Sequence, residues 1–412
     1  MRHPIHGDIV LSHAPTGPLA GQLEAFATWA TEHGYARYSR YRQVLLAASF
    51  SRWLGRRGVT ARRVSSAEVA HYLRSRTRRV RPHSGDAAAL TQFVRFLRQR
   101  DVVPAERIRS RRPTPVEHVV DTFGAYLRDE RALAPMTIVS YVPFIRAFLD
   151  DRFGTGPVRL TRVSARDVVG FVQRRAPRLH RKRAKVLTTA LRSFLRYGQA
   201  RGDIVQDLAG AVPAVAQWSM TSIPRAIPAT AVRQVLASID RHTAIGRRDY
   251  AILLGLARLG LRAGEVARLE LEDLDWAGGQ VHVRGKGHHL AALPLPTEVG
   301  AAIAAYLRHG RPSCSSRRVF VRAKAPVRGF VGAQAIGSLV RHRLARAGVT
   351  APTTGAHQFR HALATQMLRG GATLTEIGEV LRHRSPQTTA IYAKVDLETL
   401  RTLAQPWPRG ER

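Results

Sequence analysis

The chain has 412 residues, and its 66 Lys and Arg against 29 Asp and Glu give it a formal net charge of +37. Such a charge attracts polyanions, so nucleic acid is the expected partner, and the alternative is a basic solvated surface without a specific partner. The single cysteine, Cys314, excludes an internal disulfide and a multi-cysteine metal cluster, and the lack of a long apolar run or signal-peptide pattern indicates a soluble, cytoplasmic protein.

The first quarter of the sequence predicts a loose tail followed by a helical module. Residues 1–18 are rich in Pro, Gly and His, which is typical of a flexible terminus. From 19 to 106, apolar residues recur at helical spacing, as Phe26, Trp29 and Ala30 do. We therefore expect a bundle of four or five short helices in this module.

An internal repeat links this module to the next part of the chain. The stretch RVSSAEVAHYLRSR at 63–76 resembles RVSARDVVGFVQRR at 162–175, and each has a Ser followed three residues later by Glu or Asp. That spacing predicts a capping box at the start of a helix in both copies. The repeat indicates two tandem helical modules of about 90 residues, with convergence of two amphipathic bundles as the alternative.

The second helical module is expected at 115–208, after a connector rich in Arg and Pro. It contains the densest basic run of the chain, at 174–186. On one helix these charges would form a stripe along a phosphate backbone, whereas the alternative is an exposed charged face. The candidate DNA-binding residues are Arg174, Arg175, Arg178, Arg181, Lys182, Arg183 and Lys185.

A Pro-containing linker at 209–228 precedes a domain of mixed character at 229–412. A buried helix is predicted over 247–260, ending at Gly260, and two β segments at 280–283 and 290–295 are typical of a hairpin. Residues 319–321 are a possible further strand. The expected fold is mainly α: N-terminal helical DNA-binding modules, then a mixed α+β catalytic domain with a small antiparallel sheet.

The most informative stretch lies near the C-terminus. His357, Arg360 and His361 are spaced to share one face of a helix, which we expect to end at Gly370 and Gly371.

The following residues predict two more helices beside the first one. Thr373 and Glu376 form a capping box for a helix that carries His383 at its C-terminal end, and the Ser-Pro pair at 385–386 opens a helix with Tyr392 about two turns in. Three helix ends would then surround an imidazole, a guanidinium and a phenol.

A phenol beside Arg and His suggests a nucleophile that attacks a phosphodiester. Tyrosine has a pKa near 10, so the attack needs cations or a base nearby, and Arg can neutralise the phosphate oxygens. This chemistry also requires a second cation and an acid for the leaving oxygen. Arg262, just after Gly260, and Lys286, at the hairpin tip, are the upstream candidates.

These stretches together resemble the tyrosine recombinase family, also called phage integrases or Xer-type recombinases. The resemblance rests on LGLRAGEVARLELEDLDW, VRGKG, HQFRHALATQML, LRHRS and IY, and on the intervals between their functional residues. It covers about 229–400 well, the second helical module moderately and residues 1–110 poorly.

The resemblance implies a DNA strand-transferase that needs no metal or nucleotide cofactor. Tyr392 would form a 3′-phosphotyrosine, and His357 would take part in proton transfer. The other implied roles are phosphate binding by Arg262, Arg360 and His383, protonation of the 5′ leaving oxygen by Lys286, and support of the site by Glu265 and His361.

Partners and alternatives follow from the same resemblance. Double-stranded DNA would be the partner, at the bacterial nucleoid, and an amphipathic C-terminal tail implies a homo- or hetero-tetramer of the kind used in integration or transposition of mobile elements. The family often has Gly where this chain has Arg382, which we expect to be tolerated. The alternatives are a non-cleaving DNA-binding accessory protein with the same fold and a type IB topoisomerase. Taken singly, each residue has an ordinary explanation, such as a core Tyr or a solvated Lys.

Overall fold

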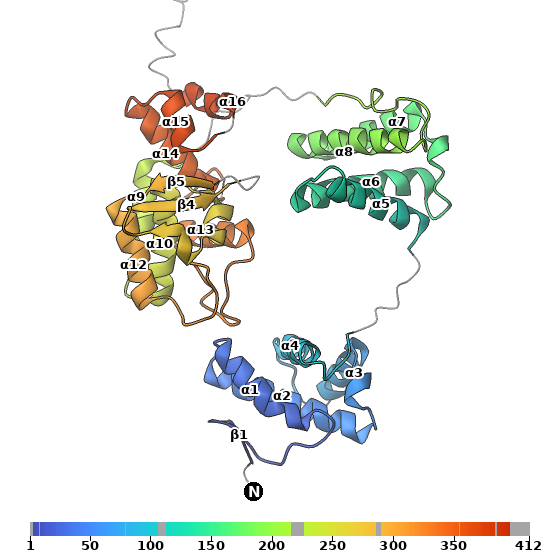
Figure 1. The fold of residues 1–412 in the computed structure, drawn as a ribbon, viewed down its shortest axis with the longest axis vertical. Helices are drawn as coiled ribbons and strands as arrows, with labels where there is room; N and C mark the ends of the chain where they lie inside the picture. Colours follow the sequence, from blue (N-terminus) through green and yellow to red (C-terminus); the bar gives the residue numbers. More distant parts are fainter. Residues whose placement is uncertain are drawn as a thin grey trace, which may run out of the picture. The chain divides into compact units, whose positions relative to one another are not determined.

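The computed structural model describes residues 3–7, 9–78, 80–105, 113–215, 226–285, 290–353, 355–383 and 385–395 (Figure 1). The chain divides into two compact units, one of residues 107–221 and one of residues 1–106 together with 222–412. The fold is mainly helical with a small antiparallel sheet, as expected. No helix in the described ranges is long and apolar enough to cross a membrane.

The N-terminal module consists of α1 (Leu23–Glu32), α2 (Arg37–Arg56), α3 (Ser66–Thr77) and α4 (Asp86–Gln99). These helices bury an aromatic core, in which the ring centroids of Phe26 and Phe93 lie 4.7 Å apart. The expected helical module is therefore present.

The prediction of a loose tail at 1–18 is wrong for residues 3–6 and 9–11. Strands β1 (His3–His6) and β2 (Ile9–Leu11) pair antiparallel, and Ile9 and Leu11 are buried in the core of the N-terminal module. Alternation of buried Ile9 and Leu11 with exposed Val10 is the strand pattern. Three residues are too short a run to stand out among Pro, Gly and His.

The second helical module repeats the order of elements of the first. It contains α5 (Pro115–Asp129), α6 (Pro135–Phe153), α7 (Ala165–Arg175) and α8 (Arg181–Ala200) around its own core.

The predicted capping residues begin equivalent helices in the two modules. The side chains of Ser65 and Ser164 accept hydrogen bonds from the backbone N–H of Glu68 and Asp167, and a 3₁₀ turn precedes each Ser. The predicted capping box is complete at Ser164 and Asp167, whereas at Ser65 the structure gives only the bond from the N–H of Glu68, so the two copies of the repeat form equivalent helices with different caps.

The linker expected at 209–228 is structured at both ends. Ala209 and Val212 are buried in the core of the second module, and Ile227 is buried in the core of the C-terminal part. Residues 216–225 lie outside the described ranges.

The C-terminal part surrounds one buried helix, α10 (Ala244–Arg258). Residues 251–257 of this helix are all buried, and Gly260 follows it with a φ of +56°. The other helices are α9 (Ala229–Ala237), α11 (Ala263–Arg268), α12 (Thr297–His309), α13 (Ala333–Arg346), α14 (His357–Arg369), α15 (Leu374–Val380) and α16 (Pro386–Thr389).

The small sheet has the order β3-β4-β5 and is antiparallel throughout. Its strands are β3 (Leu274–Asp275), β4 (Gln280–Arg284) and β5 (Leu290–Pro294), so the predicted hairpin is confirmed. The expected strand at 319–321 is instead an irregular segment in which Val321 makes one isolated bridge to Gly329.

Candidate active site

Helix α14 presents His357, Arg360 and His361 from its first two turns. It ends before Gly370 and Gly371, and Gly371 adopts a φ of +88°, so the predicted helix end is confirmed. Helices α14, α15 and α16 and the 3₁₀ helix η6 (Ala390–Val395) pack together at one end of the C-terminal part (Figure 1).

Arg360 is the buried cation of the site, with 3% of its surface exposed. Its guanidinium donates hydrogen bonds to the carbonyl oxygens of Gly260 and Leu381, which lie just beyond α10 and at the end of α15. Carbonyl groups at helix ends lack partners within the helix, so a cation suits that position. Burial, reinforced by Arg262 and Arg382, lowers the pKa of Arg360 to about 10, and the side chain stays charged at neutral pH.

Arg262 is held by Glu265 at the start of α11. Its backbone N–H donates to Glu265 Oε2 over 2.8 Å, and its Nη1 donates to Oε1 over 2.8 Å. The Glu265 side chain is 1% exposed, whereas that of Arg262 is 34% exposed. Burial alone would raise the pKa of Glu265, but the hydrogen bonds and charges of Arg262 and Arg382 outweigh it and lower that pKa. Glu265 therefore holds Arg262 in place, while part of the Arg262 side chain stays accessible to solvent.

Tyr392 is buried, and its phenol is hydrogen-bonded to His361. Its Oη lies 2.7 Å from His361 Nδ1, and only 1% of the residue is exposed. Burial raises the pKa of Tyr392 to about 12, with the positive charge of Arg360 acting in the opposite direction. At neutral pH the phenol is therefore protonated and needs an acceptor before it can attack.

The helix expected to carry Tyr392 is shorter than predicted. Helix α16 ends at Thr389, and Tyr392 lies in the 3₁₀ helix η6 that follows it. Ser385 and Pro386 occupy the predicted N-cap and N1 positions, although the Ser385 side chain makes no capping hydrogen bond. The tighter turn places the phenol against α14.

His383 lies beyond the end of α15, close to the two arginines. Its Nδ1 is 2.7 Å from Thr389 Oγ1. Burial, followed by the charges of Arg360 and Arg262, lowers the pKa of His383 to about 4, so its imidazole is neutral at pH 7.

The predicted capping box of α15 is confirmed, with hydrogen bonds in both directions between Thr373 and Glu376.

His357 lies at the edge of this cluster. It is exposed at the first position of α14, and its ring centroid is 6.2 Å from that of His361, whose own centroid is 5.6 Å from that of Tyr392. The ring of His361 therefore lies close to both the His357 ring and the phenol. Lys286 lies outside the described residues, which on the hairpin stop at Gly285 before the turn and resume at Leu290.

Two further residues contribute contacts that the sequence did not indicate. Arg382 has a φ of +55°, and its Nη2 donates to Glu265 Oε2 over 2.9 Å. Thr389 is buried and contacts His383. For Arg382, the one signal in the sequence is that the family it resembles often has Gly at this position.

The basic run at 174–186 does not form the single helical stripe that we expected. Helix α7 ends at Arg175, a 3₁₀ turn containing Pro177 follows, and α8 begins at Arg181, because proline disrupts a helix interior. All seven candidate residues are exposed, and Arg174 pairs with Asp151 over 2.6 Å.

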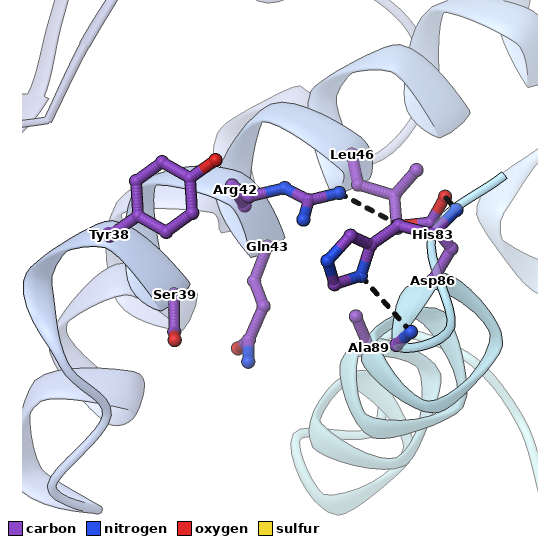
Figure 2. A pocket seen from close by; sticks show the side chains of 9 residues that line it. Tyr38, Ser39, Arg42, Gln43, Leu46, His83, Asp86 and Ala89 are labelled. Atoms are coloured by element: carbon purple, nitrogen blue, oxygen red, sulfur yellow. Dashed lines mark hydrogen bonds and ion pairs between the residues drawn. The ribbon is translucent and has the colours of Figure 1, made fainter. Parts of the chain in front are cut away.

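A separate cavity of about 340 Å³ lies in the N-terminal module (Figure 2). Asp86 at its wall accepts hydrogen bonds from Arg42 over 3.4 Å, Arg76 over 2.8 Å and the backbone N–H of His83 over 3.2 Å. The carboxylate of Asp86 is therefore paired with arginine side chains at the wall of the cavity. Among the described residues, no three His, Cys, Asp or Glu side chains gather as a set that could hold a metal ion.

Two family models match the chain. The model of the phage integrase family matches residues 225–398, which contain the whole candidate active site. The model of the phage integrase N-terminal SAM-like domain matches residues 120–202, which lie in the second helical module.

Relatives match over most of the chain. "Putative integrase/recombinase y4rA" of Sinorhizobium fredii is 52% identical over 408 residues, or 99% of both chains, so it includes the N-terminal module. The tyrosine recombinase XerD of Listeria innocua is 30% identical, and the match covers 67% of this chain and 94% of that protein.

Solved structures share the fold. The XerH site-specific recombinase in its post-cleavage complex with palindromic difH substrate has a TM-score of 0.58 at 18% identity, covering 74% of this chain and 99% of that one. A lambda integrase dimer bound to a COC′ core site has a TM-score of 0.53 at 13% identity, covering 71% and 98%.

Proposed function

Because the chain belongs to the phage integrase family of tyrosine recombinases, we propose that it cleaves and rejoins DNA strands with Tyr392 as the nucleophile. The observation that carries the proposal is the phenol of Tyr392, buried in one cluster with His361 and the guanidinium groups of Arg262 and Arg360. The two non-bridging oxygens of a phosphodiester share one negative charge. Two fixed guanidinium groups can donate hydrogen bonds to these oxygens and neutralise that charge.

The cleavage step is a displacement at phosphorus. Tyr392 Oη forms a bond to the scissile phosphorus, and the bond from phosphorus to the 5′ oxygen breaks, so the electron pair leaves with that oxygen. The leaving oxygen takes a proton from Lys286, and the phenolic proton passes to His361, the imidazole hydrogen-bonded to Oη. The product is a 3′-phosphotyrosine, which conserves the bond for attack by another 5′ hydroxyl.

This division of roles modifies the expectation for His357. That residue was expected to transfer the proton, whereas we assign this role to His361, because its Nδ1 lies within hydrogen-bond distance of the phenol oxygen. His357 is exposed at the first position of α14, so we assign it a contact to the phosphate. His383 is neutral at pH 7, so we assign it a neutral hydrogen bond to the phosphate rather than the role of a further positive charge beside the arginines.

The two helical modules would supply DNA affinity. Tyr38 and Met136 are each the second residue of the second helix of their module, and both are more than 60% exposed. Tyr41 and Val139 are each the fifth residue of those helices and are exposed as well. Figure 2 shows Tyr38 projecting from α2 beside Arg42. Equivalent exposed side chains in both modules support a shared role in contacting duplex DNA.

The assembly on DNA is part of the same proposal. Leu397, Leu400 and Leu403, which suggested a docking tail, lie outside the described residues. We propose a homo- or hetero-tetramer on two duplexes, because exchange of strands between two sites requires four nucleophiles.

The nucleophile is tested by trapping the covalent intermediate. The full chain is incubated with a labelled pool of nicked duplexes that have randomised core sequences, and adducts are resolved on a denaturing gel. We expect an adduct with the wild type and none with Tyr392→Phe, because only the phenol oxygen is lost.

A matched control is Tyr306→Phe, since Tyr306 is an equally buried tyrosine in the core of the same part of the chain. Its adduct yield should equal that of the wild type. An adduct that survives in Tyr392→Phe would refute the nucleophile. A wild-type protein that binds without forming an adduct would favour the non-cleaving accessory protein, and relaxation of supercoils without site preference would favour the topoisomerase.

A further inference from the structure

We infer that Arg382 is a positioning residue that fixes the phosphate-binding guanidinium of Arg262, an inference that rests on the proposed function. Arg382 follows Leu381, the C-terminal cap of α15, and has a φ of +55°. A left-handed residue at this place in a helix end is usually Gly, because a Cβ is unfavourable there. The chain nevertheless carries a large side chain at this position.

The side chain of Arg382 completes a buried ion cluster with Glu265. It is 13% exposed, and its Nη2 donates to Glu265 Oε2 over 2.9 Å. Glu265 Oε1 accepts from Arg262 Nη1 over 2.8 Å, so one carboxylate is held between two guanidinium groups. A buried carboxylate is stable only when its charge and lone pairs are matched. Arg382 therefore stops Glu265 from turning away from Arg262.

The backbone of the same segment binds both phosphate-binding arginines. The carbonyl oxygen of Arg382 accepts from Arg262 Nη2 over 3.2 Å, and the preceding carbonyl, of Leu381, accepts from Arg360. Two consecutive carbonyl groups thus set the spacing of the two guanidinium groups. The left-handed turn at Arg382 is what directs its carbonyl toward Arg262 while its side chain reaches Glu265.

These contacts make a prediction that a purely structural role would not. Glycine suits a φ of +55°, so Arg382→Gly keeps the turn and removes the ion pair with Glu265, together with one long hydrogen bond of 3.5 Å from Arg382 Nη1 to the carbonyl oxygen of Val380. Arg262 should then lose its fixed orientation although the fold remains. The loss should appear in the chemical step rather than in DNA affinity, since the helical modules supply most of the DNA contacts in the proposed function.

The test measures the single-turnover rate of adduct formation at saturating nicked duplex, together with DNA affinity and thermal unfolding. We expect Arg382→Gly to slow adduct formation on the order of tenfold, with affinity and unfolding temperature close to those of the wild type. Arg382→Lys should recover part of the rate, because an ammonium group can still pair with Glu265. The control Arg369→Ala removes one exposed charge from the end of α14 and should leave the rate unchanged.

A double variant separates positioning from an independent effect. If Arg382 acts through Glu265, then Glu265→Gln with Arg382→Gly should be no slower than Glu265→Gln alone. Rates that fall by the product of the two single losses would overturn the inference, as would wild-type speed in Arg382→Gly. An active wild type with an unaffected Arg382→Gly refutes this inference alone, whereas a wild type without any adduct refutes the proposed function on which it rests.

Discussion

The hydrogen bond between His361 and Tyr392 is the contact at residue scale on which the proposed chemistry depends. The raised pKa of about 12 means that the phenol of Tyr392 is almost entirely protonated at neutral pH. His361 Nδ1 lies 2.7 Å from that proton's oxygen, so transfer requires no movement of either ring. Arg360 favours the phenolate that results, because its charge acts against the effect of burial.

Removal of this imidazole gives a prediction with a pH signature. His361→Ala should slow adduct formation on the order of a hundredfold near neutral pH. The phenol of the variant must then ionise unaided, and below its pKa the ionised fraction rises about tenfold for each pH unit. The ratio of wild-type to variant rates should therefore shrink as the pH rises from about 7 to about 9. His361→Gln, which keeps a hydrogen-bonding group but is a poor base, should resemble His361→Ala. A pH-independent ratio would contradict proton transfer.

At the scale of elements, the ends of helices place the functional groups. Arg360 binds carbonyl groups beyond α10 and α15, and Arg262 precedes α11. Gly260 lies at a closely packed junction. A Cβ built on it would lie 2.7 Å from Leu381 Cδ2 and 3.1 Å from Leu363 Cδ2, and its φ of +56° disfavours any side chain.

Gly260→Ala should therefore lose both stability and activity. Left-handed strain and overpacking together should cost about 2 to 4 kcal/mol in the free energy of unfolding, measured by urea denaturation. Cleavage should fall further than stability explains, because the carbonyl of Gly260 binds Arg360.

Gly279 provides a matched control for this variant. It has a φ of +61°, and nothing lies within 4 Å of a Cβ built on it. Gly279→Ala should cost only the strain, about 1 to 2 kcal/mol, and leave the cleavage rate unchanged. Equal effects of the two variants on stability and activity would refute the packing argument.

Local signals explain what could be predicted of these elements. The capping box of Thr373 and the glycines after α14 act within a few residues, so the sequence displays them directly. The ion pair of Arg382 with Glu265 joins positions 117 residues apart, and no local pattern reports it. The charges of the basic run at 174–186 predict one helical stripe, but Pro177 divides the run into two helices.

At the scale of the whole molecule, the repeat is the feature with the widest consequence. In the described residues, both modules have four α-helices in the same order, and the relative y4rA spans the N-terminal module too. The net charge of +37 predicts that DNA affinity falls steeply with salt, because each neutralised phosphate releases counterions. Charge alone would not distinguish a DNA-contacting face from the rest of a basic surface, whereas exposed aromatic side chains can.

The exposed tyrosines of α2 allow the apolar and the electrostatic parts of DNA binding to be separated. Replacing Tyr38 and Tyr41 together by Ala should weaken binding of duplex DNA roughly tenfold through lost apolar contact. The slope of log affinity against log salt should not change, since no charge is removed. Val80→Ala is the matched control, because Val80 is an apolar side chain of the same module, 49% exposed and outside α2. Binding measured by fluorescence anisotropy should fall only for the Tyr pair. Wild-type affinity in that variant would restrict DNA contact by this face to the second module.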